Sequence, residues 1–136
     1  MNEQYISKDP EMVELLRKLD ISRPVAKTLA CLSDGRELTS HSIEMTSGLR
    51  QPEVSIAMRY LKNNSWIEIR EEKRDNGKGR PVKFYKLTVP MDRIIEKIEE
   101  GILEERKMIL RNIEELKKIS WISDFTFFHF LMDKKN

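Results

Sequence analysis

Basic residues are concentrated between residues 70 and 86, where seven lysines or arginines stand against three acidic residues. Asn76-Gly77 and Gly79 lie in this stretch, and glycine adopts positive φ without a steric penalty, so the segment predicts the tip of a β-hairpin. Cations on such a tip can contact phosphate oxygens or enter a narrow minor groove, whose negative potential attracts arginine. The candidate contacts are Arg74, Lys78, Arg80 and Lys83. The alternative is a solvated hairpin whose charges only prevent pairing at the sheet edge.

A second group of candidate residues lies at positions 50–62. Apolar side chains recur here at three- and four-residue spacings, which predicts a helix with one buried face: Val54, Ala57, Met58 and Leu61. The other faces carry side chains that can read base edges, since glutamine pairs with adenine, arginine with guanine, and isoleucine contacts the thymine methyl. They are Gln51, Ser55, Ile56 and Arg59, with Arg50 and Lys62 as flanking phosphate contacts. An ordinary solvated helix face is the alternative.

Two helices are expected before this group, and they would build the core. Asp9 followed by Pro10 predicts a helix start, because aspartate accepts free amide hydrogens and proline is tolerated in the first turn. The apolar face of this helix would be Met12, Leu15, Leu16 and Leu19. Ser22-Arg23-Pro24 predicts a second start, and Asp34-Gly35 predicts the end of the second helix.

The chain from residue 38 onward predicts a helix-turn-helix. A short helix is expected from Thr39 or Ser40 to Ser47, and Gly48 supplies a sharp turn. Gln51-Pro52-Glu53 then opens the helix that carries the candidate base-reading residues, with proline again in the first turn. Two helices joined by a tight turn, the second with a polar outer face, are typical of this motif.

Strand-like alternation of apolar residues follows the second of these helices. It covers residues 66–70 and resumes at 82–87, on either side of the basic segment. A hairpin with a long polar loop directly after a helix-turn-helix is a wing. The expected fold is therefore mainly α with a small β-hairpin (α+β): a winged helix-turn-helix domain over residues 1–90, followed by a helical dimerisation segment over residues 91–136.

Residues 91–119 predict a long helix with regularly recurring apolar residues. Its apolar residues recur at an average near 3.5 residues, although Gly101, Glu105 and Arg106 interrupt the pattern: Ile95, Ile98, Ile102, Ile109, Ile113 and Leu116. About 28 residues of helix would extend roughly 42 Å, too far for a domain of this size to cover. A second copy of the chain is the simplest partner, so these residues are expected to form a homodimer interface.

The last residues, WISDFTFFHFLMDKKN, are apolar on nearly all sides and must be buried somewhere. Packing at the dimer interface is the favoured interpretation, with Trp121, Phe125 and Phe128 as interface residues. An effector pocket and peripheral membrane contact are the alternatives, and the segment is too short to span a bilayer.

No group of residues in the sequence has the types and spacing of a catalytic, metal or cofactor site. His41 and His129 are far apart, and Cys31 lies among core residues of a predicted helix, so no nucleophile–base pair or ligand cluster can be proposed. Cys31 is interpreted as a small core residue, and His41 as a surface residue or phosphate contact. A single cysteine suits a reducing cytoplasm, and no signal peptide or membrane span is predicted. A cytoplasmic, nucleoid-associated protein without a membrane partner is expected.

Two segments, GLRQPEVSIAMRYLKNNSWIE and GKGRPVKFYKL, resemble the recognition helix and wing of archaeal winged-helix transcriptional regulators of the broad MarR, TrmB and ArsR-like kind. The resemblance covers residues 10–90 and implies the winged-helix fold, DNA binding and dimerisation. It also implies base or phosphate contacts by residues of the helix and of the wing: Arg50, Gln51, Pro52, Ser55 and Arg59, and Lys78, Arg80 and Lys83. The clustered cysteines of ArsR-type metal sensors and the large effector domain of TrmB-type sugar regulators are missing, so any small-molecule effector is unknown.

Together these features predict a homodimeric, sequence-specific transcriptional regulator that binds double-stranded DNA. The helix at 51–63 would enter the major groove, and the basic wing at 70–86 would contact the minor groove or the backbone. Two recognition helices about 34 Å apart would favour a pseudo-palindromic operator. A non-specific architectural DNA-binding protein and a winged-helix protein-interaction module are the alternatives. An enzyme is not expected.

Overall fold

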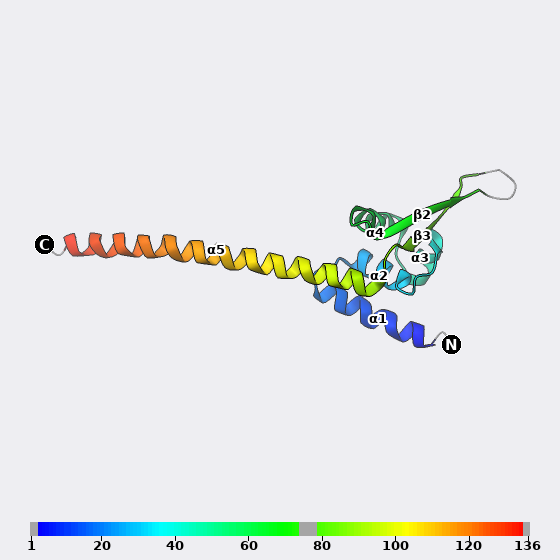
Figure 1. Ribbon diagram of the computed structural model, residues 1–136, viewed down its shortest axis with the longest axis horizontal. Helices are drawn as coiled ribbons and strands as arrows, with labels where there is room; N and C mark the ends of the chain where they lie inside the picture. Colours follow the sequence, from blue (N-terminus) through cyan, green and yellow to red (C-terminus); the bar gives the residue numbers. More distant parts are fainter. Residues whose placement is uncertain (1–2, 74–78, 135–136) are drawn as a thin grey trace. The chain divides into compact units, whose positions relative to one another are not determined.

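The chain forms helices and one small sheet, labelled in Figure 1. The computed structural model describes residues 3–73 and 79–134, with side chains from residue 10 onward. In chain order the elements are α1 (Glu3–Lys18), α2 (Arg23–Leu32), β1 (Leu38–Thr39), α3 (Ser40–Ser47), α4 (Gln51–Asn63), β2 (Ile67–Glu72), β3 (Val82–Leu87) and α5 (Met91–Lys134). They divide into two compact units, Met1–Ile94 and Ile95–Asn136.

Helix α2 lies at the centre of the core of the first unit. Most of its residues are buried, and it packs against both α1 and α4. The largest fully buried side chains include Leu29 and Leu32 of α2, Ile43 of α3, Leu61 of α4 and Ile94 at the start of α5. Burying each such side chain contributes roughly 1.5–3 kcal/mol. Cys31 is also buried, so its predicted place in the core is confirmed.

Local hydrogen bonds define the helix-turn-helix formed by α3 and α4. The Thr39 hydroxyl oxygen accepts the amide hydrogen of Ser42 at 3.1 Å and so caps the start of α3. Gly48 follows α3 with a φ of 76°, a left-handed conformation that favours glycine, and its amide donates to the carbonyl of Glu44. α4 begins with Pro52 in its first turn. Both helices and the turn between them are confirmed as predicted.

The sheet has three antiparallel strands in the order β1-β3-β2. β2 and β3 form the predicted hairpin, with Ile67 opposite Leu87 at its base. β1 adds an edge strand by pairing Leu38 with Tyr85. The sequence did not indicate β1, because two residues are too few to show the alternation that marks a strand.

The first helix differs from the prediction in its start and in its buried face. α1 begins at Glu3 and contains Pro10, whereas the sequence predicts a start at Asp9-Pro10. Proline lacks an amide hydrogen, so one helical bond is lost there, yet the helix continues on both sides. Leu16 is buried, but Leu15 and Leu19 are 55% and 44% exposed. In the described part of the chain, α1 packs chiefly against α2, which covers only one side of it.

Helix α5 is continuous for 44 residues, about 66 Å, and it includes the aromatic segment. The sequence predicts a shorter helix with a separate aromatic tail. Rings four residues apart stack along the helix surface: the centroids of Trp121 and Phe125 are 6.3 Å apart, and those of Phe125 and His129 are 5.9 Å apart. Among the residues that the structure describes, no helix has the length and apolar character needed to cross a membrane.

Candidate nucleic-acid interface

Helix α4 presents the predicted base-reading residues on its exposed side. The side chains that lie there are Arg50 just before the helix, and Gln51, Pro52, Ser55, Ile56, Arg59 and Lys62 within it. The four residues predicted to be buried face the core: Val54, Ala57, Met58 and Leu61. The predicted two-sided character of this helix is therefore confirmed, while contact with bases stays a prediction.

A surface groove of about 280 Å³ joins α4 to the sheet. The polar residues that line it are Gln51, Ser55, Arg59 and Lys62 of α4, Lys83 and Tyr85 of β3, and Ser40 of α3. Ile69 of β2 is among the apolar residues that line it. The tertiary structure thus places side chains from both predicted contact sets, the helix and the wing, in one groove.

Three cations line this groove: Arg59, Lys62 and Lys83. Within residues 10–73 and 79–134, none of the three forms an ion pair with an acidic side chain. Their charge is therefore available to an external anion. The amide of Gln51 and the hydroxyl of Ser55 line the same groove, so phosphate oxygens and base edges could be contacted together.

The opposite face of the sheet uses its cations within the protein. Arg70 donates from Nε and Nη2 to the Glu37 carboxylate at 3.0 and 2.9 Å, and its guanidinium carbon lies 4.5 Å from the centroid of the Phe84 ring. Hydrogen bonds from Arg70 lower the pKa of Glu37, and the pKa of Arg70 is raised in return. Lys86 pairs with Glu68 at 3.4 Å. Arg70 and Lys86 are therefore paired within the protein, unlike the three cations of the groove.

Replacing Glu37 with glutamine is expected to lower the thermal stability of the first unit slightly at neutral pH, and the difference should shrink as the pH falls below about 4.5. Because Arg70 holds the pKa of Glu37 below its ordinary value of 4.5, the charged pair contributes fully above that pH. Its contribution is lost as the pH falls through the lowered pKa. Melting curves of the two proteins should differ at neutral pH and converge in acid. A difference that is the same at every pH would show that charge is not responsible. The effect is small because both side chains are exposed.

Of the remaining predicted wing contacts, the structure describes Arg80, which does not line the groove. Arg80 is exposed, next to Gly79, whose φ of 89° is left-handed. Two further predicted contacts, Arg74 and Lys78, lie outside the described residues. The contribution of the wing tip to binding therefore stays a prediction.

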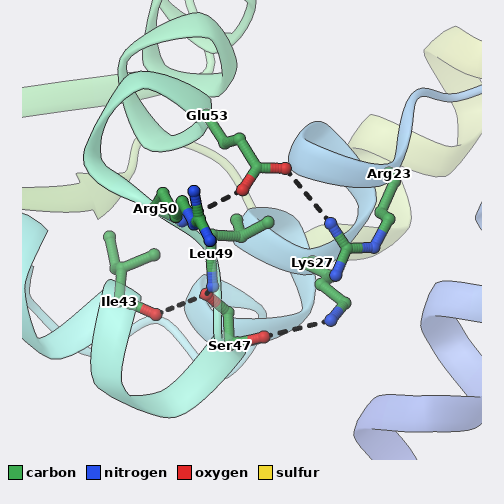
Figure 2. Close-up of polar contacts among 7 residues, drawn as sticks. All are labelled: Arg23, Lys27, Ile43, Ser47, Leu49, Arg50 and Glu53. Carbon is green, nitrogen blue, oxygen red and sulfur yellow. Dashed lines mark hydrogen bonds and ion pairs between the residues drawn. The ribbon is translucent and has the colours of Figure 1, made fainter.

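A polar network fixes the turn between α3 and α4 against α2 (Figure 2). Arg23 Nη1 donates to Glu53 Oε2 at 3.1 Å, and Oε1 of the same carboxylate accepts the amide hydrogen of Arg50 at 3.0 Å. On the other side of the turn, Lys27 Nζ donates to the carbonyl oxygen of Ser47 at 3.1 Å. These bonds tie the start of α4 to the most buried helix of the unit. The sequence did not indicate the bonds from Arg23 to Glu53 and from Lys27 to Ser47, because these partners lie 30 and 20 positions apart.

The predicted dimerisation residues lie along α5 on more than one face. Between 38% and 71% of each is exposed, except for Ile98, which is buried: Ile95, Ile98, Ile102, Ile109, Ile113, Leu116, Trp121, Phe125 and Phe128. At about 100° per residue, Phe125 lies about 180° around the helix axis from Leu116. One partner helix could not cover both positions.

The histidines and the cysteine do not form a metal site. In the part of the chain that the structure describes, no three histidine, cysteine, aspartate or glutamate side chains lie close enough to hold a metal ion. His41 is exposed near the start of α3, and His129 stacks on an aromatic ring of α5.

The fold and the groove together define a class of protein. A helix-turn-helix whose second helix has an exposed polar side, followed by antiparallel wing strands, is a winged helix-turn-helix fold, here mainly helical and extended by the long helix α5. Among solved structures, the chain is similar to reduced HlyU from Vibrio cholerae, with 20% sequence identity and a TM-score of 0.43 over 73% of this chain and 92% of that chain. No protein-family model and no curated protein matches the chain.

Proposed function

We propose that this protein is a sequence-specific transcriptional regulator that binds double-stranded DNA as a homodimer in the cytoplasm. The observation that carries the proposal is the groove between α4 and β3, in which Gln51 lies with the cations Arg59, Lys62 and Lys83. Amide and guanidinium groups can read base edges, and lysines neutralise phosphates. If α4 only presented an ordinary solvated face, there would be no reason to expect cations from the helix and from a strand distant in sequence to line the same groove.

The winged helix-turn-helix suggests how DNA would lie on this surface. The exposed side of α4 would enter the major groove, and the wing would reach towards the minor groove. The phosphate backbone between the two grooves would then pass along the groove of the protein, flanked by Lys62 and Lys83. Arg80 would lie farther along the wing, where a narrow minor groove attracts arginine.

Dimerisation would occur along α5. Ile95, Ile102, Ile109 and Leu116 recur every seven residues, and at least 38% of each is exposed. A second copy of the same stripe would cover these side chains in a two-stranded coiled coil. We call these four residues the apolar stripe. Two DNA-binding units joined in this way would favour a pseudo-palindromic operator with half-sites about 34 Å apart.

A selection of bound DNA tests the proposal. The purified protein is mixed at physiological salt with sheared DNA from its own source, and the bound fragments are recovered and sequenced. We expect a few fragments that share a pseudo-palindrome. Uniform recovery without a shared motif would favour the architectural alternative, in which backbone contacts supply the affinity. If no DNA is recovered, neither the sequence-specific regulator nor the architectural protein would be supported. A protein-interaction module would then be favoured.

Replacing Arg59 with alanine is expected to lower operator affinity by roughly tenfold to a hundredfold and to relax the choice of base at one position. Lys83→Ala should instead weaken all duplexes similarly and lower the slope of log affinity against log salt by about one unit, because it removes a phosphate contact. Binding curves on the operator and on single-base variants, at several salt concentrations, measure both effects.

Lys86→Ala is the matched control for Lys83, because it lies on the same strand but on the opposite face and pairs with Glu68. It should leave the salt slope nearly unchanged. Equal losses for Arg59→Ala and Lys83→Ala on every sequence would contradict the assigned roles.

A further inference from the structure

A cavity of about 410 Å³ lies where α1, α2 and α3 meet, and it shares no lining residue with the groove beside α4. It belongs entirely to the first unit. We call it the three-helix pocket. Its volume is in the range of small-molecule sites, roughly 300–1,000 Å³. The residues that line it are Pro10 and Val13 of α1, Lys27, Ala30 and Cys31 of α2, and Thr46 and Ser47 of α3.

The three-helix pocket combines apolar walls with a cation. Among its described lining residues, Lys27 alone carries a charge, while α1 and α2 supply apolar surface. Lys27 Nζ donates a hydrogen bond to the carbonyl oxygen of Ser47 at 3.1 Å. An ammonium group has three hydrogens to donate. In the part of the chain whose side chains are described, Lys27 forms no ion pair with an acidic residue. Two of its hydrogens are therefore available to an anion in the pocket.

These walls fit a small organic carboxylate with an apolar body. A carboxylate oxygen accepts a charge-assisted hydrogen bond from an ammonium group, which is stronger than a bond between neutral groups. The apolar body would lie against Pro10, Val13 and Ala30, and its removal from water would add to the affinity. An inorganic anion such as phosphate has no such body, so the walls favour a monocarboxylate.

The lysine of the pocket also holds the turn of the helix-turn-helix (Figure 2). Ser47 is the last residue of α3, and its carbonyl accepts the Lys27 hydrogen bond just before the left-handed turn at Gly48. A carboxylate bound to the other two hydrogens of Lys27 would leave this bond intact. It would also contact α1, α2 and α3 together. An occupied pocket would therefore favour the arrangement in which the turn is held against α2.

We propose that the three-helix pocket binds a small apolar monocarboxylate, an effector that strengthens DNA binding. The coupling to DNA rests on the proposed function, whereas the binding of the carboxylate does not. A ligand shifts a conformational equilibrium only as far as it prefers one state. This ligand would prefer the state in which Lys27 is bonded to Ser47, with α4 positioned for DNA. Because such coupling is reciprocal, operator DNA should raise the affinity for the carboxylate by the same factor.

Titration of the full-length protein with 2-naphthoate, followed through backbone amide resonances by NMR, tests the site. A ligand of about 13 non-hydrogen atoms is expected to bind with a dissociation constant on the order of 1 mM. The shifts should be largest around Val13, Ala30 and Thr46. The uncharged 2-naphthamide has the same rings, and it should bind about tenfold more weakly because the charge-assisted bond is lost. Inorganic phosphate should not bind.

Two variants of the pocket test its walls separately. Lys27→Met removes the ammonium group but keeps most of the apolar stem, so it should weaken 2-naphthoate about tenfold and leave 2-naphthamide unchanged. Lys27→Arg should restore binding. Val13→Phe fills the pocket without touching the lysine, and it should weaken both ligands equally. Lys18→Met is the matched control, because Lys18 is exposed on α1 and pairs with Glu14 at 3.4 Å. It should bind like the wild type.

Operator binding with about 10 mM 2-naphthoate, compared with sodium chloride at equal ionic strength, tests the coupling. The affinity should rise roughly fivefold for the wild type and Lys18→Met. It should not change for Lys27→Met or Val13→Phe, whatever their own affinity.

The two titrations separate failure of the pocket from failure of the proposed function. Equal affinity of the wild type and a folded Lys27→Met protein for 2-naphthoate would overturn the pocket, as would shifts confined to other helices. An operator affinity that falls or stays constant would overturn the coupling. A protein that binds 2-naphthoate as expected but binds no DNA would reject the regulator and the coupling, while supporting the pocket.

Discussion

Replacing Ile109 with aspartate is expected to convert the protein to a monomer and to lower operator affinity by roughly a hundredfold or more. Ile109 lies at the middle of the apolar stripe, seven residues from both Ile102 and Leu116, and 52% of it is exposed in the single chain. In a coiled coil, each copy would place a carboxylate against the other in an apolar seam, where an unpaired charge costs several kcal/mol. Loss of the dimer removes the linkage between two half-sites, which is worth about a hundredfold to ten-thousandfold in affinity.

Light scattering and binding to the full operator measure the two parts of this prediction. Lys107→Asp is the control, because it introduces the same side chain two positions away, on about the opposite side of the helix. It should remain assembled and bind normally. An Ile109→Asp protein that keeps its mass would show that the stripe is not the dimer interface. A monomer with unchanged affinity would show instead that one winged helix-turn-helix unit suffices for binding.

Truncating Leu61 to alanine is expected to destabilise the first unit by about 3 kcal/mol, within the usual range of roughly 2–5 kcal/mol for a buried leucine. Leu61 is completely buried on the inner side of α4, against a core that includes α2. Removing its side chain leaves a cavity that the surrounding core can fill only in part. Urea unfolding of the variant and the wild type measures the loss of free energy.

Ile56→Ala on the same helix provides the matched control. Ile56 is 54% exposed on the outer side, so its truncation should change stability by less than about 0.5 kcal/mol. It should instead lower operator affinity several-fold, because a contact with a thymine methyl would be lost. If Ile56→Ala unfolded the protein while Leu61→Ala left it stable, the two sides of α4 would be wrongly assigned.

Local patterns in the sequence were sufficient to predict most elements of the first unit. The cap at Thr39, the left-handed turn at Gly48 and the first-turn proline of α4 depend on neighbours within a few positions, so their signals are visible in the chain itself. The burial of Val54 and Leu61 also follows from spacing alone, because a helix places residues three and four apart on one side. The predicted start of α1 was wrong because proline disfavours a helix interior without excluding it.

The candidate site depended on contacts that no local pattern encodes. The pairing of Arg70 with Glu37 joins residues 33 positions apart, and it removes one cation from the basic segment. Lys83 and Arg59 come from a strand and a helix, yet they line the same groove. All cations of the segment look equivalent in the sequence, because the chain does not show which of them lie next to a carboxylate on the same face of the sheet.

The sequence by itself determined the order of the helices and of the two hairpin strands, the inner and outer sides of α4 and the apolar stripe of α5, since each follows from the period of one element. Only the tertiary structure decided which cations remain available in the groove, how α2 holds the start of α4, and that the aromatic segment continues α5, with Phe125 on the side opposite Leu116. These features depend on distances between side chains remote in sequence, or on the length of uninterrupted helix that fixes their relative angle.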